Sequence, residues 1–150
     1  MENLQTTELR IGNLVFDKKR NRIVTVWGIE SNHDKIVVNY ANGSGVYSID
    51  LKHIESIQLT EEILLKFGFE KYDWFDGCFI KCNNKHLMIQ FYEPKQEILI
   101  YFTKISKDKD GHKMNGRDYL FKLKKYYVHQ LQNLYFTLID KELEYNKNKP

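Results

Sequence analysis

The feature that most constrains the fold is a series of short runs rich in β-branched and aromatic residues, each closed by a polar turn. The runs of the first third are Ile11–Phe16, Arg22–Ile29, Lys35–Tyr40 and Val46–Leu51. The last two runs are separated by Asn-Gly, a pair suited to a hairpin turn because both residues tolerate positive φ. Several short antiparallel strands within about 55 residues predict a small SH3-like β-barrel.

The composition supports sheets and argues against a disordered chain. The 150 residues include ten Tyr, nine Phe and two Trp, and 42% of all residues are hydrophobic. Aromatic and β-branched side chains favour strands, and this apolar content is sufficient to offset the entropy lost on folding. A chain of this length is one domain, or two small ones.

The middle of the chain predicts a short helix followed by a second group of strands. Thr60 suits an N-cap, acidic residues follow it, and Gly68 suits the position after the helix end. Three further runs are spaced as in a β-meander, and they are Cys78–Cys82, His86–Tyr92 and Glu97–Thr103. The polar stretch Lys104–Asp118 predicts an exposed loop or a long hairpin tip, with Tyr119–Leu123 as a last strand.

The clearest helix is predicted over Tyr127–Ile139. At 100° per residue its apolar positions form one stripe, made of Val128, Leu131, Leu134, Tyr135 and Leu138. We expect this stripe to pack on the β-meander, and the tail Tyr145–Pro150 to fray. The expected fold is therefore α+β, with a barrel over 1–59, a linking helix over 60–69, and a meander plus C-terminal helix over 70–150; the two β halves are free to form one unit.

The helix face opposite the apolar stripe carries the first candidate binding residues. These are His129, Asn133 and Phe136, with Asp140 directly after the helix. Phe136 lies about 140° from Leu131, where an amphipathic helix presents polar residues. Either a second layer of the protein buries Phe136, or the ring is an anchor in a surface that binds a partner.

A nucleic-acid site is the alternative, and it would use the N-terminal barrel. Its candidate residues are a basic turn and two aromatic residues that could stack bases: Lys18, Lys19, Arg20, Arg22, Trp27 and Tyr47. The net charge of +3 is weak for a nucleic-acid binder, and 20 acidic residues are interspersed with 23 basic ones. Charged turns that keep a barrel soluble explain the same pattern.

The motifs searched for catalysis and metal binding do not predict either function. No P-loop, dinucleotide, zinc-protease or serine-hydrolase signature occurs, so we expect no enzyme and no cofactor. Cys78 and Cys82 would stand about 13 Å apart on one strand, too far to share a tetrahedral zinc ion with His86. The acidic stretch after Ser106 has Arg117 where a calcium loop needs Glu.

The chain has no predicted route into a membrane or out of the cell. Its N-terminus is polar, and its longest apolar run, Ile98–Phe102, is far shorter than the roughly 20 residues of a membrane helix. Two cysteines do not make a disulfide scaffold. We therefore expect a protein of the cytoplasm.

Three segments resemble those of uncharacterised small proteins of Bacteroidetes bacteria and of their phages and mobile elements. The segments are Leu9–Asn13, Leu59–Glu62 with Phe67–Phe69, and Tyr127–Phe136. Members of this group often have Gly near the position of Asp140, which would end the helix there. Because Asp adopts the left-handed conformation of such a cap less readily than Gly does, we expect the helix of this chain to continue toward Leu143. The resemblance implies a setting among phage and mobile-element proteins in a bacterial host cell, and no catalytic residues.

Three hypotheses for function follow from these observations. The first is a non-catalytic protein-interaction module, a phage or mobile-element accessory that acts on a host protein, such as a defence protein, or associates with itself. The second is a nucleic-acid-binding module. The third is a protein that sequesters a small anionic nucleotide.

Overall fold

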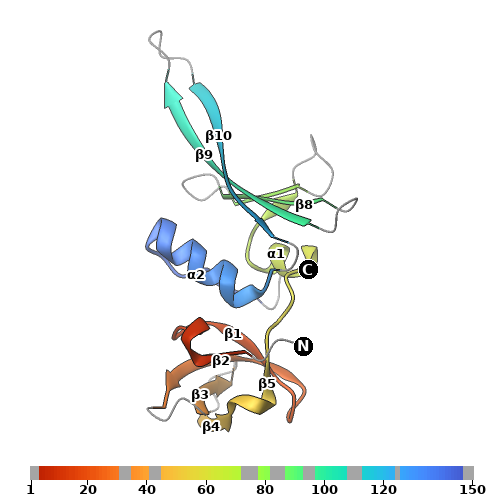
Figure 1. Cartoon of the computed structure of the whole chain (residues 1–150), viewed down its shortest axis with the longest axis vertical. Helices are drawn as coiled ribbons and strands as arrows, with labels where there is room; N and C mark the ends of the chain where they lie inside the picture. The colour runs from red at the N-terminus through yellow and green to blue at the C-terminus, as the bar shows by residue number, and fades with distance from the viewer. Residues whose placement is uncertain are drawn as a thin grey trace. The chain divides into compact units, whose positions relative to one another are not determined.

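The computed structural model describes residues 4–30, 35–40, 45–71, 78–81, 87–92, 97–107, 113–123 and 126–146. The chain is α+β, with two antiparallel five-stranded sheets and two α-helices in these residues (Figure 1). It divides into two compact units. Unit 1 comprises Met1–Gln58 and Tyr127–Leu143, and unit 2 comprises Leu59–Tyr126 and Glu144–Pro150.

Unit 1 contains the first sheet. Its strands are β1 (Leu14–Asp17), β2 (Arg22–Ile29), β3 (Lys35–Tyr40), β4 (Val46–Asp50) and β5 (Ile54–Glu55), with the 3-10 helices η1 (Thr6–Glu8) and η2 (Leu51–His53). The strand order is β4-β3-β2-β1-β5, and all of its strand pairs are antiparallel. The predictions of β2 and β3 are confirmed at both ends, and β1 begins three residues later than predicted.

The core of this sheet comes from alternate positions of its strands, since successive side chains of a strand point to opposite faces. The buried cluster contains Leu4, Leu9, Val15, Val24, Val26, Ile36, Val38, Ile49 and Ile54. Trp27 is the extra residue of a β-bulge, because Val26 pairs with Val38 while Gly28 pairs with Val37. A bulge bends its strand and lets one side chain leave the normal alternation.

Unit 2 contains the second sheet. Its elements are α1 (Glu61–Lys66), β6 (Glu70–Lys71), β7 (Cys78–Lys81), β8 (Leu87–Tyr92), β9 (Glu97–Lys107) and β10 (Lys113–Leu123). The order β10-β9-β8-β7-β6 is a simple antiparallel meander, which confirms the prediction of a meander.

The long β9–β10 hairpin confirms the hairpin alternative predicted for Lys104–Asp118 and corrects the start of the last strand, which was predicted at Tyr119. The stretch Lys104–Asp118 is largely strand, because β9 continues to Lys107 and β10 begins at Lys113, with Lys113 opposite Lys107. Strand pairing is made by backbone groups, so polar side chains can continue a two-stranded ribbon well past its apolar part. Residues 108–112 lie outside the described residues.

The start and end of α1 confirm the predicted caps. The Thr60 hydroxyl oxygen accepts a hydrogen bond from the Ile63 amide at 3.3 Å. Gly68 has φ 80°, and the amides of Gly68 and Phe69 donate to the carbonyls of Leu65 and Leu64, as in a Schellman motif.

Part of the tail expected to fray is ordered against α1. The ring of Tyr145 lies 5.3 Å from that of Phe67, edge to face, and the Asn146 amide donates to the Lys66 carbonyl at 2.9 Å. The remaining tail residues, 147–150, lie outside the described residues.

The second helix, α2 (Val128–Ile139), is grouped differently from the prediction. It was expected to cover the meander within 70–150, whereas it forms a compact unit with the first sheet. The physical reason lies in its side chains, since polar contacts join α2 to residues at the start of β1 that are 120 positions away. In Figure 1 the blue α2 and the red β1 belong to this one unit.

Candidate contact surface

The centre of the candidate site is a tight turn immediately before β1, formed by Arg10–Asn13. The Asn13 amide donates to the Arg10 carbonyl at 3.1 Å, and Gly12 has φ 93° while Ile11 does not have positive φ. These are the features of a type II turn, which requires positive φ at its third residue. Ile11 therefore occupies the corner of the turn, and its side chain is 58% exposed.

The turn is joined to β2 by a G1 bulge. The Gly12 amide donates to the Val26 carbonyl, and the Val26 amide donates to the Asn13 carbonyl, both at 2.8 Å. Two residues thus oppose one, with the glycine in the left-handed region. Ile11 precedes this bonded group in the turn, and Trp27 follows it on β2. Trp27 is 57% exposed.

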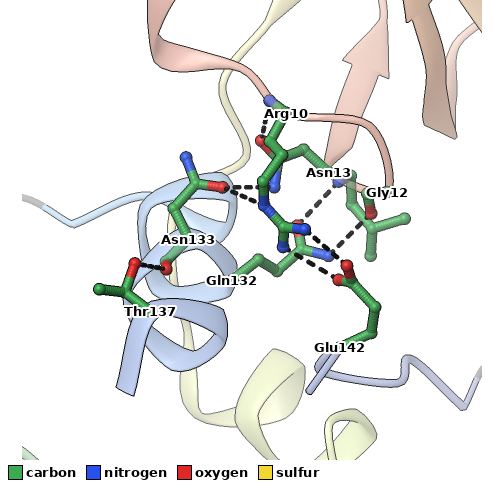
Figure 2. Close-up of polar contacts among 8 residues, drawn as sticks. Arg10, Gly12, Asn13, Gln132, Asn133, Thr137 and Glu142 are labelled. Atoms are coloured by element: carbon green, nitrogen blue, oxygen red, sulfur yellow. Dashed lines mark hydrogen bonds and ion pairs between the residues drawn. The ribbon is translucent and has the colours of Figure 1, made fainter. Parts of the chain in front are cut away.

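Gln132 of α2 holds the same turn from its other side (Figure 2). Its side-chain nitrogen donates to the Gly12 carbonyl at 3.1 Å, and its side-chain oxygen accepts from the Leu14 amide at 2.8 Å. The Gln132 side chain is almost fully buried, with the residue 2% exposed. The Gln132 amide group therefore makes the two hydrogen bonds that a neighbouring strand would otherwise make. It donates one to the backbone carbonyl and accepts one from the backbone amide.

Asn133, the next residue of α2, binds three points of the N-terminal segment. Its Oδ1 accepts from the Asn13 side chain at 2.9 Å and from Arg10 Nε at 3.4 Å. Its Nδ2 donates to the Glu8 carbonyl at 3.0 Å. Figure 2 shows the amide of Asn133 directed at Arg10 and Asn13, while the Thr137 hydroxyl donates to the Asn133 backbone carbonyl.

Arg10 connects this turn to the chain that follows α2. Its two terminal nitrogens bind the two carboxylate oxygens of Glu142 at 2.5 and 3.0 Å. Its guanidinium carbon also lies 4.0 Å from the centre of the Phe136 ring, within cation–π distance. Both members of the ion pair are partly exposed, so solvent screens much of their attraction.

Of the four predicted binding residues on or after α2, two make contacts with the N-terminal segment of unit 1. Asn133 binds the turn, and Phe136, half-buried, is covered by the Arg10 guanidinium, so both have partners within unit 1. Asp140 is exposed and ends the helix with φ 56° and ψ 37°, which corrects the expectation that α2 continues toward Leu143. Asp is among the few residues that tolerate this left-handed conformation.

His129, the remaining predicted binding residue, is buried and not available on the surface, since only 1% of the residue is exposed. Neither of its ring nitrogens has a hydrogen-bond partner among the described residues, and its ring stacks on Tyr127 at a centroid distance of 5.9 Å. Burial lowers the pKa of His129 below its usual value, and the negative charge of Glu8 only partly opposes this shift.

The residues of the predicted nucleic-acid site have different roles in the fold. Asp17 is a fully buried carboxylate that accepts from the Tyr47 hydroxyl at 2.6 Å and from Arg20 Nη1 at 3.2 Å. The Arg20 guanidinium lies 4.0 Å from the centre of the Tyr47 ring. Burial alone would raise the pKa of Asp17, but hydrogen bonds from Tyr47 and Arg20 hold that pKa below its usual value. Arg20 and Tyr47 therefore stabilise the fold around a buried acid.

The other predicted nucleic-acid residues lie on β2 and on the turn that precedes it, with Arg22 opposite Asp17 in the pairing of β1 with β2. Lys18 forms an ion pair with Glu55 at 3.3 Å, Lys19 is exposed, and Arg22 is partly buried at the start of β2. Trp27 is five residues further along β2, about 16 Å at the usual strand rise. The structure thus separates the exposed indole from the basic turn.

The sequence of α2 does contain a feature from which the role of Gln132 could have been predicted. Gln132 is one turn from Val128 and Tyr135, so it stands within the apolar stripe, and a buried amide needs a partner. Ile11, Asn13 and Glu142 carried no comparable signal, because their roles depend on contacts with distant segments.

Two findings restrict the chemistry of the described residues. No three His, Cys, Asp or Glu side chains among them are placed to share a metal ion, although Cys82 and His86 lie outside the described residues. Neither helix in the described part of the chain has the length and apolar character needed to cross a membrane.

Two of the three segments that carry the resemblance, Leu9–Asn13 and Tyr127–Phe136, supply most of the contacts at this turn. Comparison of the chain with family models, with curated proteins and with solved structures found no match.

Proposed function

We propose that the protein is a non-catalytic protein-interaction module, and that Ile11 and Trp27 form the centre of its contact surface. The observation that carries this proposal is the exposure of two large apolar residues, 58% and 57%, each next in sequence to the hydrogen-bonded group of Gly12, Asn13 and Val26. Exposed aromatic anchors on rigid backbone are typical of residues that dominate protein–protein interfaces.

We propose that the protein acts in the cytoplasm of a bacterial host cell. We propose that the protein is a phage or mobile-element accessory that binds a host protein or a second copy of itself. The resemblance supports the setting, and the surface chemistry supports the mode of action. Trp27 is favoured over Phe136 as the anchor because Phe136 already packs against Arg10.

We also propose that β1 to β5 form an SH3-like barrel. Three observations support this: β5 returns to pair with β1, a one-turn 3-10 helix precedes β5, and a bulge bends β2. Nuclear Overhauser contacts between β4 and β5 are the expected result. Rapid exchange of outward-facing amides along β4, as on a free sheet edge, would contradict closure.

The proposed function is tested with Trp27→Thr and a matched control, Val46→Thr. Both positions lie on strands of unit 1 with similar exposure, 57% and 54%, and threonine suits a strand, so both variants should fold. Immobilised wild-type chain and the two variants are incubated with host lysate, and retained proteins are quantified by mass spectrometry. Sedimentation velocity on the chain alone measures self-association.

Trp27→Thr is expected to lose at least about tenfold in retained partner or in self-association, while Val46→Thr behaves as wild type. Equal retention by all three chains would contradict the contact surface. Fluorescence anisotropy with labelled DNA and RNA separates the nucleic-acid alternative, for which affinity would fall steeply as salt rises. A large thermal shift with one nucleotide would instead indicate the sequestering function.

A further inference from the structure

The hairpin of β9 and β10 is longer than the part of the second sheet that it joins. In the described strands, the pairing of β8 with β9 ends at Leu87 opposite Phe102. The pairing of β9 with β10 continues for five further register pairs, which join Thr103–Lys107 to Lys113–Arg117. These ten residues form a two-stranded ribbon that projects beyond β8 (Figure 1), and we call it the ribbon arm.

The ribbon arm holds the basic surplus of the whole chain. Its sequence contains Lys104, Lys107, Lys113 and Arg117, and no Asp or Glu. The chain has a formal net charge of +3 and the arm has +4, so all remaining residues together carry a net charge of −1. The small net charge of the chain is therefore no argument against a nucleic-acid site on this arm, because a polyanion responds to where the charge is concentrated.

Two register pairs of the arm suit a bound polyanion better than an isolated hairpin. Lys107 is directly opposite Lys113, and like charges at opposite positions destabilise a strand pair. Gly116, opposite Lys104, lies inside β10, where glycine weakens a strand and often marks the close approach of another backbone. A phosphate backbone beside the arm would neutralise the two lysines, and it can come close at the glycine.

The dimensions of the arm fit one groove of duplex DNA. Paired strands lie about 4.8 Å apart, and five residues of an antiparallel strand extend about 14 Å from the first Cα to the last. The major groove of B-DNA is about 12 Å wide and about 8.5 Å deep, and it admits a two-stranded β-ribbon. Duplex RNA has a deep and narrow major groove that protein groups do not enter. The arm therefore suits DNA better than RNA.

We propose that the ribbon arm is a DNA-binding element that enters the major groove of duplex DNA, where its basic residues neutralise phosphates. This function goes beyond the proposed protein contact, since the arm belongs to unit 2 whereas Ile11 and Trp27 belong to unit 1. Phosphate contacts carry no sequence information. The binding is therefore non-specific, and its affinity falls as the salt concentration rises.

The test measures binding of the full chain to a fluorescein-labelled DNA duplex of about 20 base pairs, by anisotropy, from about 25 to about 200 mM NaCl. The arm variant is Lys107→Thr with Lys113→Thr. Threonine suits a strand, and the change removes a like-charge pair, so the hairpin should form. The matched control, Lys35→Thr with Lys71→Thr, removes the same charge from exposed strand positions outside the arm.

For four neutralised phosphates, the logarithm of the binding constant is expected to fall with the logarithm of the salt concentration at a slope of about −3.6. The arm variant should reduce the slope to about −1.8 and lose at least about tenfold in affinity at the lowest salt, while the control follows the wild type. Absence of binding by the wild type at the lowest salt would overturn the proposal. Equal losses in the arm variant and the control would also overturn it.

Three further results would assign the binding elsewhere and reject the arm. Loss of affinity in Lys18→Thr with Lys19→Thr, but not in the arm variant, would place the DNA on the basic turn before β2. Equal affinity for duplex RNA of the same sequence would exclude the major groove, and equal affinity for polyglutamate would show that any polyanion suffices. If thermal unfolding shows that the arm variant does not fold, Lys104→Thr with Arg117→Thr removes the same charge and is read by the same criteria.

Discussion

At the scale of single residues, Gly12 is required by the backbone conformation of the turn. Its φ of 93° is a conformation that side chains with a Cβ rarely adopt, and a Cβ built there would lie 3.4 Å from the Glu142 carboxylate. The carboxylate is held in place by Arg10. The positive φ of the turn is therefore the condition that calls for glycine, because a Cβ contact of 3.4 Å with the end of a long side chain is close to an ordinary one.

Gly12→Ala is expected to lower the free energy of unfolding by about 1–2 kcal/mol, because alanine is strained in the left-handed region. Urea denaturation of the two chains measures the change. A matched substitution, Gly45→Ala, also places alanine at positive φ but with nothing within 4 Å of its Cβ. A loss at Gly12 smaller than that at Gly45 would contradict the role of the turn.

His129 makes the stability of the protein depend on pH. Its folded-state pKa is lowered by burial, so between the unfolded-state value of about 6.5 and the lower folded-state value the unfolded chain binds more protons. The contribution of His129 to stability is therefore greatest above pH 7, falls as the pH drops through about 6.5, and becomes constant again below the folded-state pKa. The maximum slope for one proton is about 1.4 kcal/mol per pH unit.

His129→Leu removes this titration and leaves the other histidines in place. The difference in unfolding free energy between wild type and variant, measured by urea titration from pH 7.5 to 5, is expected to change with pH. The wild type loses more stability than the variant as the pH falls. Parallel curves over this range would show that His129 is not buried as a neutral ring.

At the scale of elements, α2 ends at a residue that suits its conformation only moderately. Asp140 adopts the left-handed cap, and its amide donates to the Phe136 carbonyl at 2.8 Å. Glycine has no Cβ and adopts this conformation without strain. Asp140→Gly should therefore raise the free energy of unfolding by about 0.5–1 kcal/mol, as measured by urea denaturation. A loss of stability would mean that the Asp140 side chain has a role of its own.

The elements that were predicted well are those whose signals are local. β2 and β3 follow from β-branched runs between turns, and both ends of α1 follow from Thr60 and Gly68. The end of α2 was wrong because the preference of Asp against the left-handed region is small, and the chain must turn there for Glu142 to reach Arg10. For the polar part of β9 and β10 the sequence left a loop and a long hairpin tip as alternatives, because backbone pairing leaves no apolar pattern.

At the scale of the whole molecule, sequence patterns could not assign α2 to a sheet. Its apolar stripe would suit either sheet. The first sheet is distinguished by contacts of Gln132, Asn133 and Phe136 with residues about 120 positions away. The candidate site was missed for the same reason. The sequence singled out Asn133 and Phe136 as unusual residues of the helix, but their partners within unit 1 lie at the other end of the sequence.

The grouping of α2 with the first sheet predicts how the chain opens. Gln132→Leu leaves the Leu14 amide and the Gly12 carbonyl without their partner, at a cost of about 1–3 kcal/mol. Amide exchange should accelerate in β1 and β2 of unit 1 and remain unchanged in β8 of unit 2. Acceleration in β8 without acceleration in β1 would show that α2 unfolds with the meander instead.

The central claim is that Ile11 and Trp27 meet a protein partner, and photo-crosslinking in the host tests it most directly. Benzoylphenylalanine replaces Ile11, Trp27 or, as control, Val46, which is similarly exposed in the same unit. Illumination of living cells is expected to give the same crosslinked protein, or a crosslinked dimer, from positions 11 and 27 and none from position 46. Adducts of equal yield from all three positions, or adducts from position 46 alone, would contradict the account.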